Sequence, residues 1–495
     1  MDTRRVQHFL KGKTILVTGT TGYLAKVLLE KILRIQPEIK KLYLLVRALN
    51  TELATRRLQN EVIQKDLFKV LRDKWGEDFD SLISEKLVAI AGDVSLENLG
   101  LKDENLNNEM LDEIDIIVNS AASTKFDERF DISMGVNTMG ALHVLNFAKK
   151  CHRMEILVHI STAYVYGEAK DGEAILLEKP FQMGRSLKGA LKLDIHAEMN
   201  LMEKKMDELR AKNASESTFK FAMKDYGIER AKLYGWPNTY VFTKAMGEML
   251  VMHHKDDVPL TIIRPTMVTS TYKDPFPGWM EGLRTLDSII VGYGQGKITC
   301  FPGHPKTIVD TIPADLVINC VITAIVAHSN KAPRNFIYHI GSSLRNPLKF
   351  SDVHNISYHT FLKTPCKNEN GKPIVISKGT LLTNIAAFNS YMKIRYVLPL
   401  QVLNLVNKVS CQLFKDVYDV NNRKIKMVMR LAELYKPYIF SKVVFDDTNT
   451  ENLRKVTKDH LPVEDVGLDF DPKSIDWTEY MMNAHIPGLL KYAIK

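Results

Sequence analysis

The chain has 495 residues, more than one hydrophobic core usually holds, so we expect at least two domains. Hydrophobic residues make up 45% and charged residues 25% of the sequence, a composition typical of a folded globular protein and not of a disordered or fibrous one. The formal net charge of +9 favours polyanionic ligands or an anionic membrane surface, or it reflects a lysine-rich surface, and no segment resembles a nucleic-acid-binding module.

Short apolar runs alternate with amphipathic helical patterns in the first third of the chain. Near-continuous apolar strands separated by helices are typical of a parallel sheet covered on both faces. We therefore expect an α/β fold with a Rossmann-type, doubly wound parallel sheet. The expected strands are 14–18, 42–46, 86–93, 115–122, 156–162 and, later in the chain, 260–266.

No segment is expected to cross a membrane or to direct export. Residues 1–13 are short and polar and lack the apolar core of a signal peptide or the long lead of a transit peptide. The longest apolar stretch, 316–327, is too short for a spanning helix and contains Asn319.

Two insertions, and a change from alternating strands and helices to helices alone, suggest the domain organisation. Residues 52–84 form a charged helical stretch, and residues 168–235, with a helix at 200–212, follow the fifth strand. The alternation with strands ends after about residue 380, beyond the polar stretch 364–373. We predict a nucleotide-binding reductase domain with substrate-binding insertions, a connector and a mainly helical C-terminal domain, at 1–363, 364–384 and 385–495.

The first predicted strand leads into a glycine-containing loop, in TILVTGTTGYLAK (14–26). Gly19 and Gly22 follow the strand, and Ala25 stands where a third glycine often occurs. Glycine permits a tight turn and lets backbone N–H groups approach a pyrophosphate at a helix N-terminus. With a clear strand before it and a clear helix after it, this loop predicts a dinucleotide site.

The following strand ends carry further candidate cofactor contacts. Arg47 stands where NAD-preferring proteins usually carry an acid, and its guanidinium suits the 2′-phosphate of NADP, so NADPH is favoured over NADH unless Arg47 is an ordinary surface residue. Asp93, at the end of the third strand, suits a hydrogen bond to the edge of the adenine, and the small residues 119–122 leave room for the cofactor to lie along them. Both segments can equally be ordinary caps at the ends of their strands. The residues expected to contact the cofactor are Gly19, Thr21, Gly22, Tyr23, Leu24, Arg47, Asp93, Val94, Asn119, Ala121, Tyr240, Lys244 and Pro265.

A metal site and a disulfide framework are not expected. The 5 cysteines are scattered without a Cys-x-x-Cys pair, and the 14 histidines form no metal-binding motif. His354 and His359 are interpreted as ordinary residues. The cysteine pattern favours a reducing compartment.

A tyrosine four residues before a lysine is a candidate catalytic pair, and the chain contains several. Tyr166/Lys170 has a glycine inside it, Tyr293/Lys297 lies among glycines, and Tyr438/Lys442 lies beyond the predicted sheet. Tyr240 and Lys244 instead begin a good helix that follows a strand ending in Ser161 and Thr162. The order of glycine loop, Ser/Thr strand end and Tyr/Lys helix therefore selects Tyr240/Lys244.

These residue types suit the reduction of a carbonyl group. An alkoxide that forms after hydride addition needs a proton, which Tyr240 would donate. Lys244 would stabilise the phenolate and bond the nicotinamide ribose. We chose Thr162 over Ser161 to polarise the substrate oxygen, because alternation along the strand places it toward the cofactor.

Several segments resemble those of the extended short-chain dehydrogenase/reductases and, within them, the plant-type alcohol-forming fatty acyl-CoA reductases. They span nearly the whole chain, and 235–248 together with 275–287 are the most specific. The mild departures, Thr20 and Tyr23, leave the glycine geometry intact. The matching segments are ILVTGTTGYLAK, LYLLVR, FDERFD, HISTAYVYGE, GWPNTYVFTKAMGE, IIRPTMVTST, PFPGWMEGLRTLD, DTIPADLV and DWTEYMMNAHIPGLLKY.

The resemblance implies the four-electron reduction of a long-chain or very-long-chain fatty acyl-CoA to a primary alcohol with two NADPH, through an aldehyde. It implies that Thr162, Tyr240 and Lys244 serve both steps. It also implies peripheral association with the cytosolic face of the endoplasmic reticulum, with the cytosol as second choice. The insertion 168–235 is the candidate for acyl-chain or membrane contact, or it is a solvated cap over the cleft. Chain length and oligomeric state are not predicted.

Two other functions fit part of the sequence. An extended reductase of a sterol, nucleotide sugar or flavonoid-type ketone shares the glycine loop and the Tyr/Lys pair, but usually lacks a long helical region after the sheet. A non-catalytic scaffold of the same fold needs none of Thr162, Tyr240 and Lys244.

Overall fold

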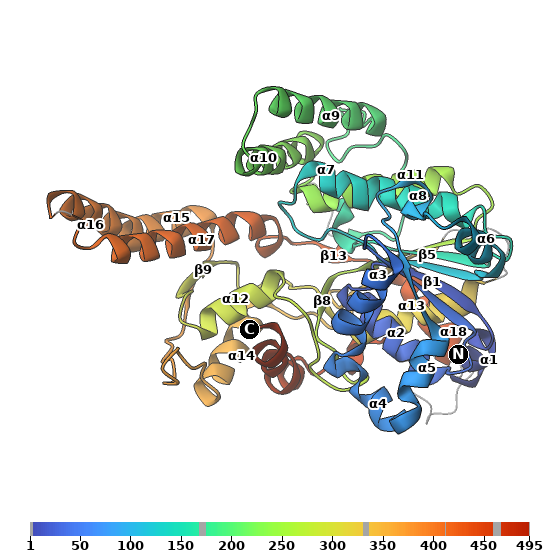
Figure 1. The fold of residues 1–495 in the computed structure, drawn as a ribbon. Coiled ribbons are helices and arrows are strands. Elements are labelled where there is room, and N and C mark those ends of the chain that lie inside the picture. The colour runs from blue at the N-terminus through green and yellow to red at the C-terminus, as the bar shows by residue number, and fades with distance from the viewer. Residues whose placement is uncertain (1–2, 168–174, 330–335, 411, 459–466, 495) are drawn as a thin grey trace.

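The computed structural model describes residues 3–167, 175–329, 336–410, 412–458 and 467–494. A seven-stranded, wholly parallel sheet forms its centre, in the order β11-β7-β5-β4-β1-β2-β3 (Figure 1). This confirms the predicted Rossmann-type α/β fold. The strands are β1 (Thr14–Thr18), β2 (Lys41–Val46), β3 (Leu87–Ala91), β4 (Ile116–Asn119), β5 (Ile156–Ile160), β7 (Leu260–Pro265) and β11 (Phe336–Ile340). All but the edge strand β11 fall on the predicted runs.

Helices cover both faces of the sheet because alternate strand residues are apolar on both sides. Ile15 and Val17 of β1 pack toward α2 (Tyr23–Ile35) and α13 (Ala314–His328), whereas Leu16 packs toward α8 (Gly140–Ala148). Figure 1 shows α8 and α11 (Thr239–His254) on one side and α2 and α13 on the other. The shorter helices at the sheet are α1 (Thr3–Leu10), α6 (Glu104–Glu113) and α7 (Phe130–Ser133).

Both predicted insertions are helical. The first contains α3 (Thr51–Leu58), α4 (Lys69–Trp75) and α5 (Phe79–Lys86) between β2 and β3. In the second, α9 (Ile195–Ala211) and α10 (Glu216–Tyr234) lie side by side at the outer edge of the molecule (Figure 1), and most of the predicted helix at 200–212 falls within α9. Residues 168–174 of this insertion lie outside the described residues.

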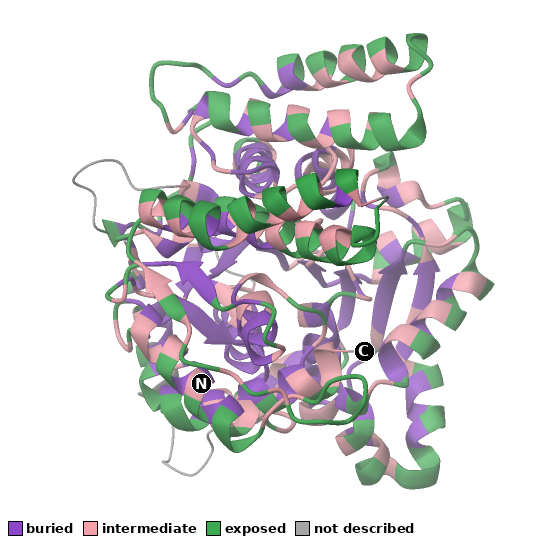
Figure 2. Cartoon of the chain, turned by 90° about the vertical axis from the view of Figure 1, so that its left-hand side faces the viewer, coloured by how far each residue is buried: buried purple, intermediate pink, exposed green. Residues whose placement is uncertain are grey.

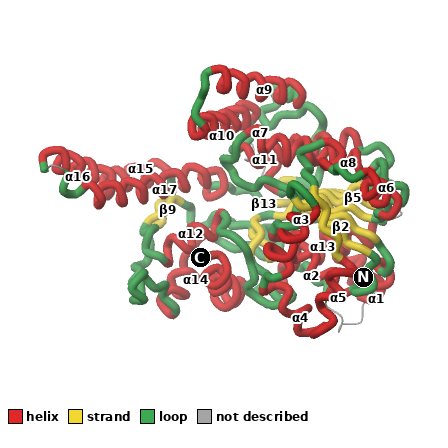
Figure 3. The backbone as a smooth tube through the Cα atoms, viewed as in Figure 1, coloured by secondary structure: helices red, strands yellow, loops and turns green. Residues whose placement is uncertain are grey.

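A long helical arm projects from the molecule (Figures 1 and 3). We define the arm as residues 385–410 and 412–439, comprising α15 (Ile385–Met392), α16 (Leu398–Val409) and α17 (Lys415–Ile439). Figure 2, in which the arm points toward the viewer, shows it mostly exposed. The elements at its base are α12 (Thr285–Gly294), α14 (Phe350–Lys363) and two small sheets, β8 (Met267–Thr269) with β10 (Thr311–Pro313) and β9 (Cys300–Pro302) with β12 (Thr380–Leu382).

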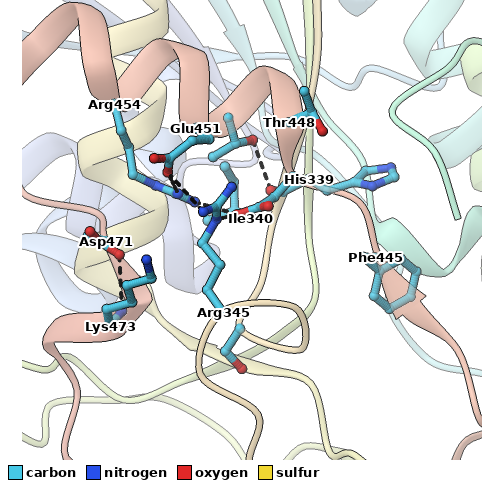
Figure 4. A network of polar contacts seen from close by, with 12 residues as sticks. His339, Ile340, Arg345, Phe445, Thr448, Glu451, Arg454, Asp471 and Lys473 are labelled. Atoms are coloured by element: carbon cyan, nitrogen blue, oxygen red, sulfur yellow. Dashed lines mark hydrogen bonds and ion pairs between the residues drawn. The ribbon is translucent and has the colours of Figure 1, made fainter. Parts of the chain in front are cut away.

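After the arm the chain returns to the central sheet. β13 (Val444–Phe445) pairs in parallel with β6 (Ile175–Leu176), and α18 (Thr448–Lys458) packs against β11. Thr450 of α18 donates a hydrogen bond to the carbonyl oxygen of His339. Arg454 and Arg345 both pair with the carboxylate of Asp447. Figure 4 shows these two arginines beside Glu451, with which both also pair. The last helices are α19 (Trp477–Tyr480) and α20 (Ile486–Gly488).

Candidate active site

A cleft lies at the carboxyl edge of the sheet, where ligands of open parallel sheets bind. It encloses about 1810 Å³, including its open mouth. Its walls come from the glycine loop, the ends of β4, β5 and β7, the first turns of α11 and α12, and the end of α17. The C-terminal helical region thus contributes directly to this cleft.

The glycine loop has a geometry that only glycine allows. Gly19 has φ +67°, and a Cβ there would lie 2.7 Å from the backbone of Ala121. Gly22 precedes α2 without any side-chain cap, so the first N–H groups of this 13-residue helix stay available at the cleft. These features fit a nucleotide pyrophosphate at the N-terminus of α2. Ala25 is buried, as close helix–sheet packing requires.

Tyr240 and Thr162 lie together in the cleft, close enough for the Thr162 hydroxyl to influence the pKa of Tyr240. Asn238 starts α11 by accepting a hydrogen bond from the backbone N–H of Val241 at 3.2 Å, which positions Tyr240 in the first turn. Burial raises the pKa of Tyr240 to about 12, whereas the nearby Thr162 hydroxyl and the positive charge of Arg284 act in the opposite direction. At neutral pH the phenol therefore keeps its proton.

Lys244 lies one turn further along α11 and is fully buried. Its ammonium donates a hydrogen bond of 2.7 Å to the carbonyl oxygen of Ile160, at the end of β5. Burial lowers the pKa of Lys244 to about 8, partly offset by the carboxylate of Glu248. Glu248 is itself held by Arg264, in an ion pair whose side chains are both 0% exposed.

An aromatic cluster, Phe126, Tyr164, Tyr435 and Tyr438, covers Tyr240. The ring of Phe126 stacks on Tyr240 with centroids 6.3 Å apart, and Tyr435 and Tyr438 meet Phe126 at 5.9 and 5.4 Å. The hydroxyl of Tyr438 accepts a hydrogen bond of 2.8 Å from the side chain of Asn238. The cluster therefore connects the C-terminal region to the start of α11.

Arg284 is a cation in the same cleft, on the residue before α12. Its guanidinium lies 4.6 Å from the ring centroid of Tyr23, and its charge lowers the pKa of Tyr240. Among the described residues, no carboxylate pairs with Arg284. Arg284 is thus placed to meet an anionic group of a ligand between the glycine loop and Tyr240.

The cleft brings together some of the predicted residues and not others. Those that line it are Gly22, Tyr23, Leu24, Thr162, Tyr240, Lys244 and Pro265. Ser161, which was set aside for Thr162, also lines it, and its buried Oγ has no hydrogen-bond partner among the described residues.

The other predicted cofactor residues lie at or near the same sheet edge but do not line this cleft. Arg47 follows β2 with an exposed side chain, and Asp93 follows β3, where its carboxylate accepts a hydrogen bond from Ser95. Asn119 is buried and bonded to Thr18 and His159. Gly19, Thr21, Val94 and Ala121 also lie outside the lining, whereas Ser120 and Ala122, the neighbours of Ala121, are part of it.

The rejected Tyr/Lys pairs differ in their surroundings. The hydroxyl of Tyr166 donates to the carbonyl oxygen of Lys179, and Lys170 lies outside the described residues. Tyr293 donates to the carbonyl oxygen of Ser377. Tyr438 was rejected for its distance from the sheet in sequence, yet it lines the cleft. Within the described ranges, no group of three or more His, Cys, Asp or Glu side chains is arranged to hold a metal ion.

The residues that sequence reasoning missed are Arg284, Phe126, Tyr164, Tyr435 and Tyr438. Phe126 and Arg284 lie in FDERFD and PFPGWMEGLRTLD, segments that carried the family resemblance without an assigned role. The tyrosines of α17 had no comparable signal, because only the tertiary fold brings that helix to the cleft.

Comparisons with known proteins identify the family to which the chain belongs. Two family models, both described as male sterility protein, match residues 17–321 and 395–495, the first as an NAD-binding domain. Fatty acyl-CoA reductase 1 of Arabidopsis thaliana is 52% identical over 496 residues, covering 100% of both chains. The alcohol-forming fatty acyl-CoA reductase of Simmondsia chinensis is 49% identical and covers 99% of both. The reductase domain of a nonribosomal peptide synthetase from Mycobacterium tuberculosis shares the fold, with a TM-score of 0.56, 16% identity, and 99% and 96% of the two chains covered.

Proposed function

Because the chain belongs to the family of the plant fatty acyl-CoA reductases, we propose that it reduces a fatty acyl-CoA to a primary alcohol and free CoA with NADPH. The observation that carries the proposal is the meeting of Tyr240, Thr162 and Lys244 beside the glycine loop. Reduction of a thioester to an alcohol takes two hydrides, which the nicotinamide supplies when bound. The first addition gives a hemithioacetal that releases CoA as a thiol and leaves an aldehyde, and the second gives the alcohol.

Tyr240 suits the role of proton donor in this direction. Each hydride addition places negative charge on the substrate oxygen, and an alkoxide is a stronger base than the phenolate of Tyr240, whose pKa is about 12. Proton transfer from Tyr240 to that oxygen is therefore downhill. The hydroxyl groups of Thr162 and Ser161 would hold the oxygen beside Tyr240.

Lys244 would act through its charge and its remaining N–H donors. A pKa of about 8 keeps the side chain mainly protonated at neutral pH. The ammonium has three donors and uses one for the carbonyl oxygen of Ile160, so the others can hold a ribose hydroxyl of the cofactor. This arrangement would fix the nicotinamide beside Tyr240.

The decisive experiment is the stoichiometry of turnover by the purified protein. With saturated acyl-CoAs of increasing length, two NADPH should be consumed per primary alcohol identified by mass. Tyr240→Phe should abolish reduction while NADPH binding stays largely intact, because the ring is kept and only the proton donor is lost. Tyr226→Phe on α10, outside the cleft, is the matched control. Full activity of Tyr240→Phe would remove Tyr240 from the mechanism.

The preference for NADPH over NADH rests on Arg47. It stands directly after β2 with an exposed side chain, where a guanidinium can pair with a 2′-phosphate. Arg47→Glu should weaken the binding of NADPH far more than that of NADH, measured as two dissociation constants. An unchanged ratio of the two constants would exclude Arg47 from cofactor selection.

We also propose that the arm holds the protein at the cytosolic face of the endoplasmic reticulum membrane. Six large apolar side chains among the described residues of the arm are more than half exposed, with Val409 at 87% and Leu413 at 76%. Exposed Lys408, Lys415 and Arg423 lie among them, a mixture suited to an anionic bilayer surface. None of the described helices is long and apolar enough to cross a bilayer. The arm would therefore lie in the interface.

Sedimentation with lipid vesicles tests the role of the arm. The full chain should pellet with vesicles of phosphatidylcholine and phosphatidylserine, and less so at high salt because the basic residues contribute. Val402→Glu combined with Leu405→Glu should abolish pelleting, since both side chains are exposed on α16. The control Leu96→Glu changes an exposed leucine outside the arm. Equal pelleting of all three proteins would refute the assignment.

A further inference from the structure

The proposed substrate must extend in two directions from the reacting carbon, with its CoA group on one side and its alkyl chain on the other. Two further cavities lie beyond the cleft. The first, here the inner cavity, spans about 670 Å³, and the second, here the terminal cavity, spans about 460 Å³, both including their openings to solvent. The cleft and the inner cavity share Tyr164, Met267, Leu286 and Tyr435 as lining residues. The inner and terminal cavities share Leu286, Ile289 and Phe350.

We propose that the alkyl chain of the acyl-CoA runs from Tyr240 through the inner cavity into the terminal cavity, along α12. This inference rests on the proposed function and locates the acyl site within it. The CoA group would then leave through the open mouth of the cleft, where Arg284 offers a cation.

Helix α12 forms the common wall of this path. Leu286, Ile289, Ile290 and Tyr293 recur at the spacing of one helical face, and all border the terminal cavity. Leu286 alone among them lines the cleft as well as both cavities. The helix begins within PFPGWMEGLRTLD, whose apolar residues had no assigned role. An apolar stripe that borders empty space, and not only the packed core, is what an alkyl chain requires.

The chemistry of the lining suits a hydrocarbon. Ile298, Phe301, Val353 and Leu381 are further apolar residues of the terminal cavity, whose uncharged polar residues are Thr299, Ser357 and Thr380. Its one ionisable imidazole among the described residues, His354, has its pKa lowered by burial and by nearby Lys378, so it stays neutral. In the inner cavity, the carboxyl group of Asp310 accepts a hydrogen bond of 2.7 Å from the backbone N–H of Ser342, and burial raises its pKa. Asp310 is thus the one Asp or Glu among the described residues that line the two cavities.

An apolar path that buries the alkyl chain predicts a strong dependence on chain length. Each buried methylene group contributes about 0.8 kcal/mol, so two more carbons should raise kcat/KM roughly tenfold until the chain reaches the end of the terminal cavity. Beyond that length the value should level or fall. A chain that lay on the protein surface would show a much weaker dependence, because its methylene groups would stay in water.

Ile289→Trp tests the path by filling the passage between the two cavities. The ratio of kcat/KM for hexadecanoyl-CoA to that for octanoyl-CoA should fall about a hundredfold relative to the wild type. Leu233→Trp adds the same indole at an exposed position of α10, 39% exposed, and should leave the ratio unchanged. An unaltered ratio in Ile289→Trp, or an equal fall in Leu233→Trp, overturns the inference. If the wild type reduces no acyl-CoA at all, the proposed function fails instead.

A photoreactive substrate gives a second measurement that needs no variant. A hexadecanoyl-CoA with a diazirine at its terminal carbon, irradiated with the wild-type protein and NADP, should label peptides containing 286–301 or 350–357. Labelling confined to the arm or to the mouth of the cleft near Phe126 would overturn the path, even where the protein reduces the substrate.

Discussion

Replacing Lys244 by methionine should make the protein more stable at pH 7 while it ends catalysis. Burial lowers the pKa of Lys244 from 10.5 to about 8, and a difference of this size corresponds to about 3 kcal/mol of penalty for the buried ammonium. The lost hydrogen bond to the carbonyl oxygen of Ile160 offsets about 1 kcal/mol. A net gain of about 2 kcal/mol remains. Glu248 keeps its partner Arg264, so no charge is left unpaired.

The pH dependence of stability distinguishes the removal of the buried Lys244 ammonium from a general effect of methionine on packing. Between pH 8 and 10.5 the unfolded wild-type chain holds a proton on Lys244 that the folded chain has released. The stability of the wild type should therefore rise with pH through this window, and the advantage of Lys244→Met should shrink. Methionine matches the length of the lysine stem and carries no titratable group.

The assay is urea unfolding at pH 7 and pH 9.5, together with NADPH-dependent reduction of an acyl-CoA. The control Lys102→Met changes an exposed lysine and should shift stability by less than about 0.5 kcal/mol. A Lys244→Met protein that is less stable than the wild type at pH 7, or whose advantage does not change with pH, would refute the reasoning. Retained turnover would separately remove Lys244 from the mechanism.

Three further changes test other parts of the site. Arg284→Ala should weaken the binding of NADPH or acyl-CoA by about tenfold and raise the pKa of Tyr240, because the positive charge is lost. Arg284→Lys keeps the charge and should lose less of the binding. Unchanged dissociation constants for both ligands would contradict a role of Arg284 in anion binding. Arg264→Met should destabilise the protein by about 3 to 5 kcal/mol, because it strands a buried carboxylate, and Glu248→Leu added to it should recover much of the loss in urea unfolding. Burial raises the pKa of Glu178 to about 7, so the stability of the wild type should fall as pH rises from about 4.5 to 7. Glu178→Gln should reduce this dependence of the thermal unfolding temperature on pH. An equal dependence in the variant would exclude Glu178 as its cause.

The parts of the molecule that sequence predicted well are those set by local patterns. Strands β1 and β5 are continuous apolar runs, and the conformation of Gly19 at φ +67° follows from the need for a tight turn after β1. Tyr240 could be selected because the glycine loop, the Thr162 strand end and its helix follow one another in a fixed order. The edge strand β11 was missed, since only its pairing with β7 distinguishes its short run from a loop.

The remaining part of the site depends on contacts between distant segments. Tyr438 is 200 residues from its partner Asn238, and no periodicity or spacing in the sequence connects them. The pair Tyr438/Lys442 was in fact rejected as catalytic because it lies beyond the predicted sheet in the sequence. Thr162 and Tyr240 both line the cleft, but the cation found to act on Tyr240 is Arg284, while Lys244, which was expected to stabilise the phenolate, is directed to the carbonyl oxygen of Ile160. Burial raises the pKa of Tyr240 and lowers that of Lys244, and no pattern in the sequence predicted how deeply the two side chains are buried.

Helix α17 links the two surfaces on which the proposed function depends. It has 25 residues and is therefore about 38 Å long, and it runs from the exposed end of the arm to the cleft, which its last turns line. Tyr435 and Tyr438, in those last turns, contact Phe126 and so cover Tyr240. One rigid element thus joins the surface proposed to meet lipid with the wall of the reaction site. The C-terminal region thus completes the wall of the candidate site: without α17, Phe126 would lose both tyrosines, and Tyr240 would face water on that side.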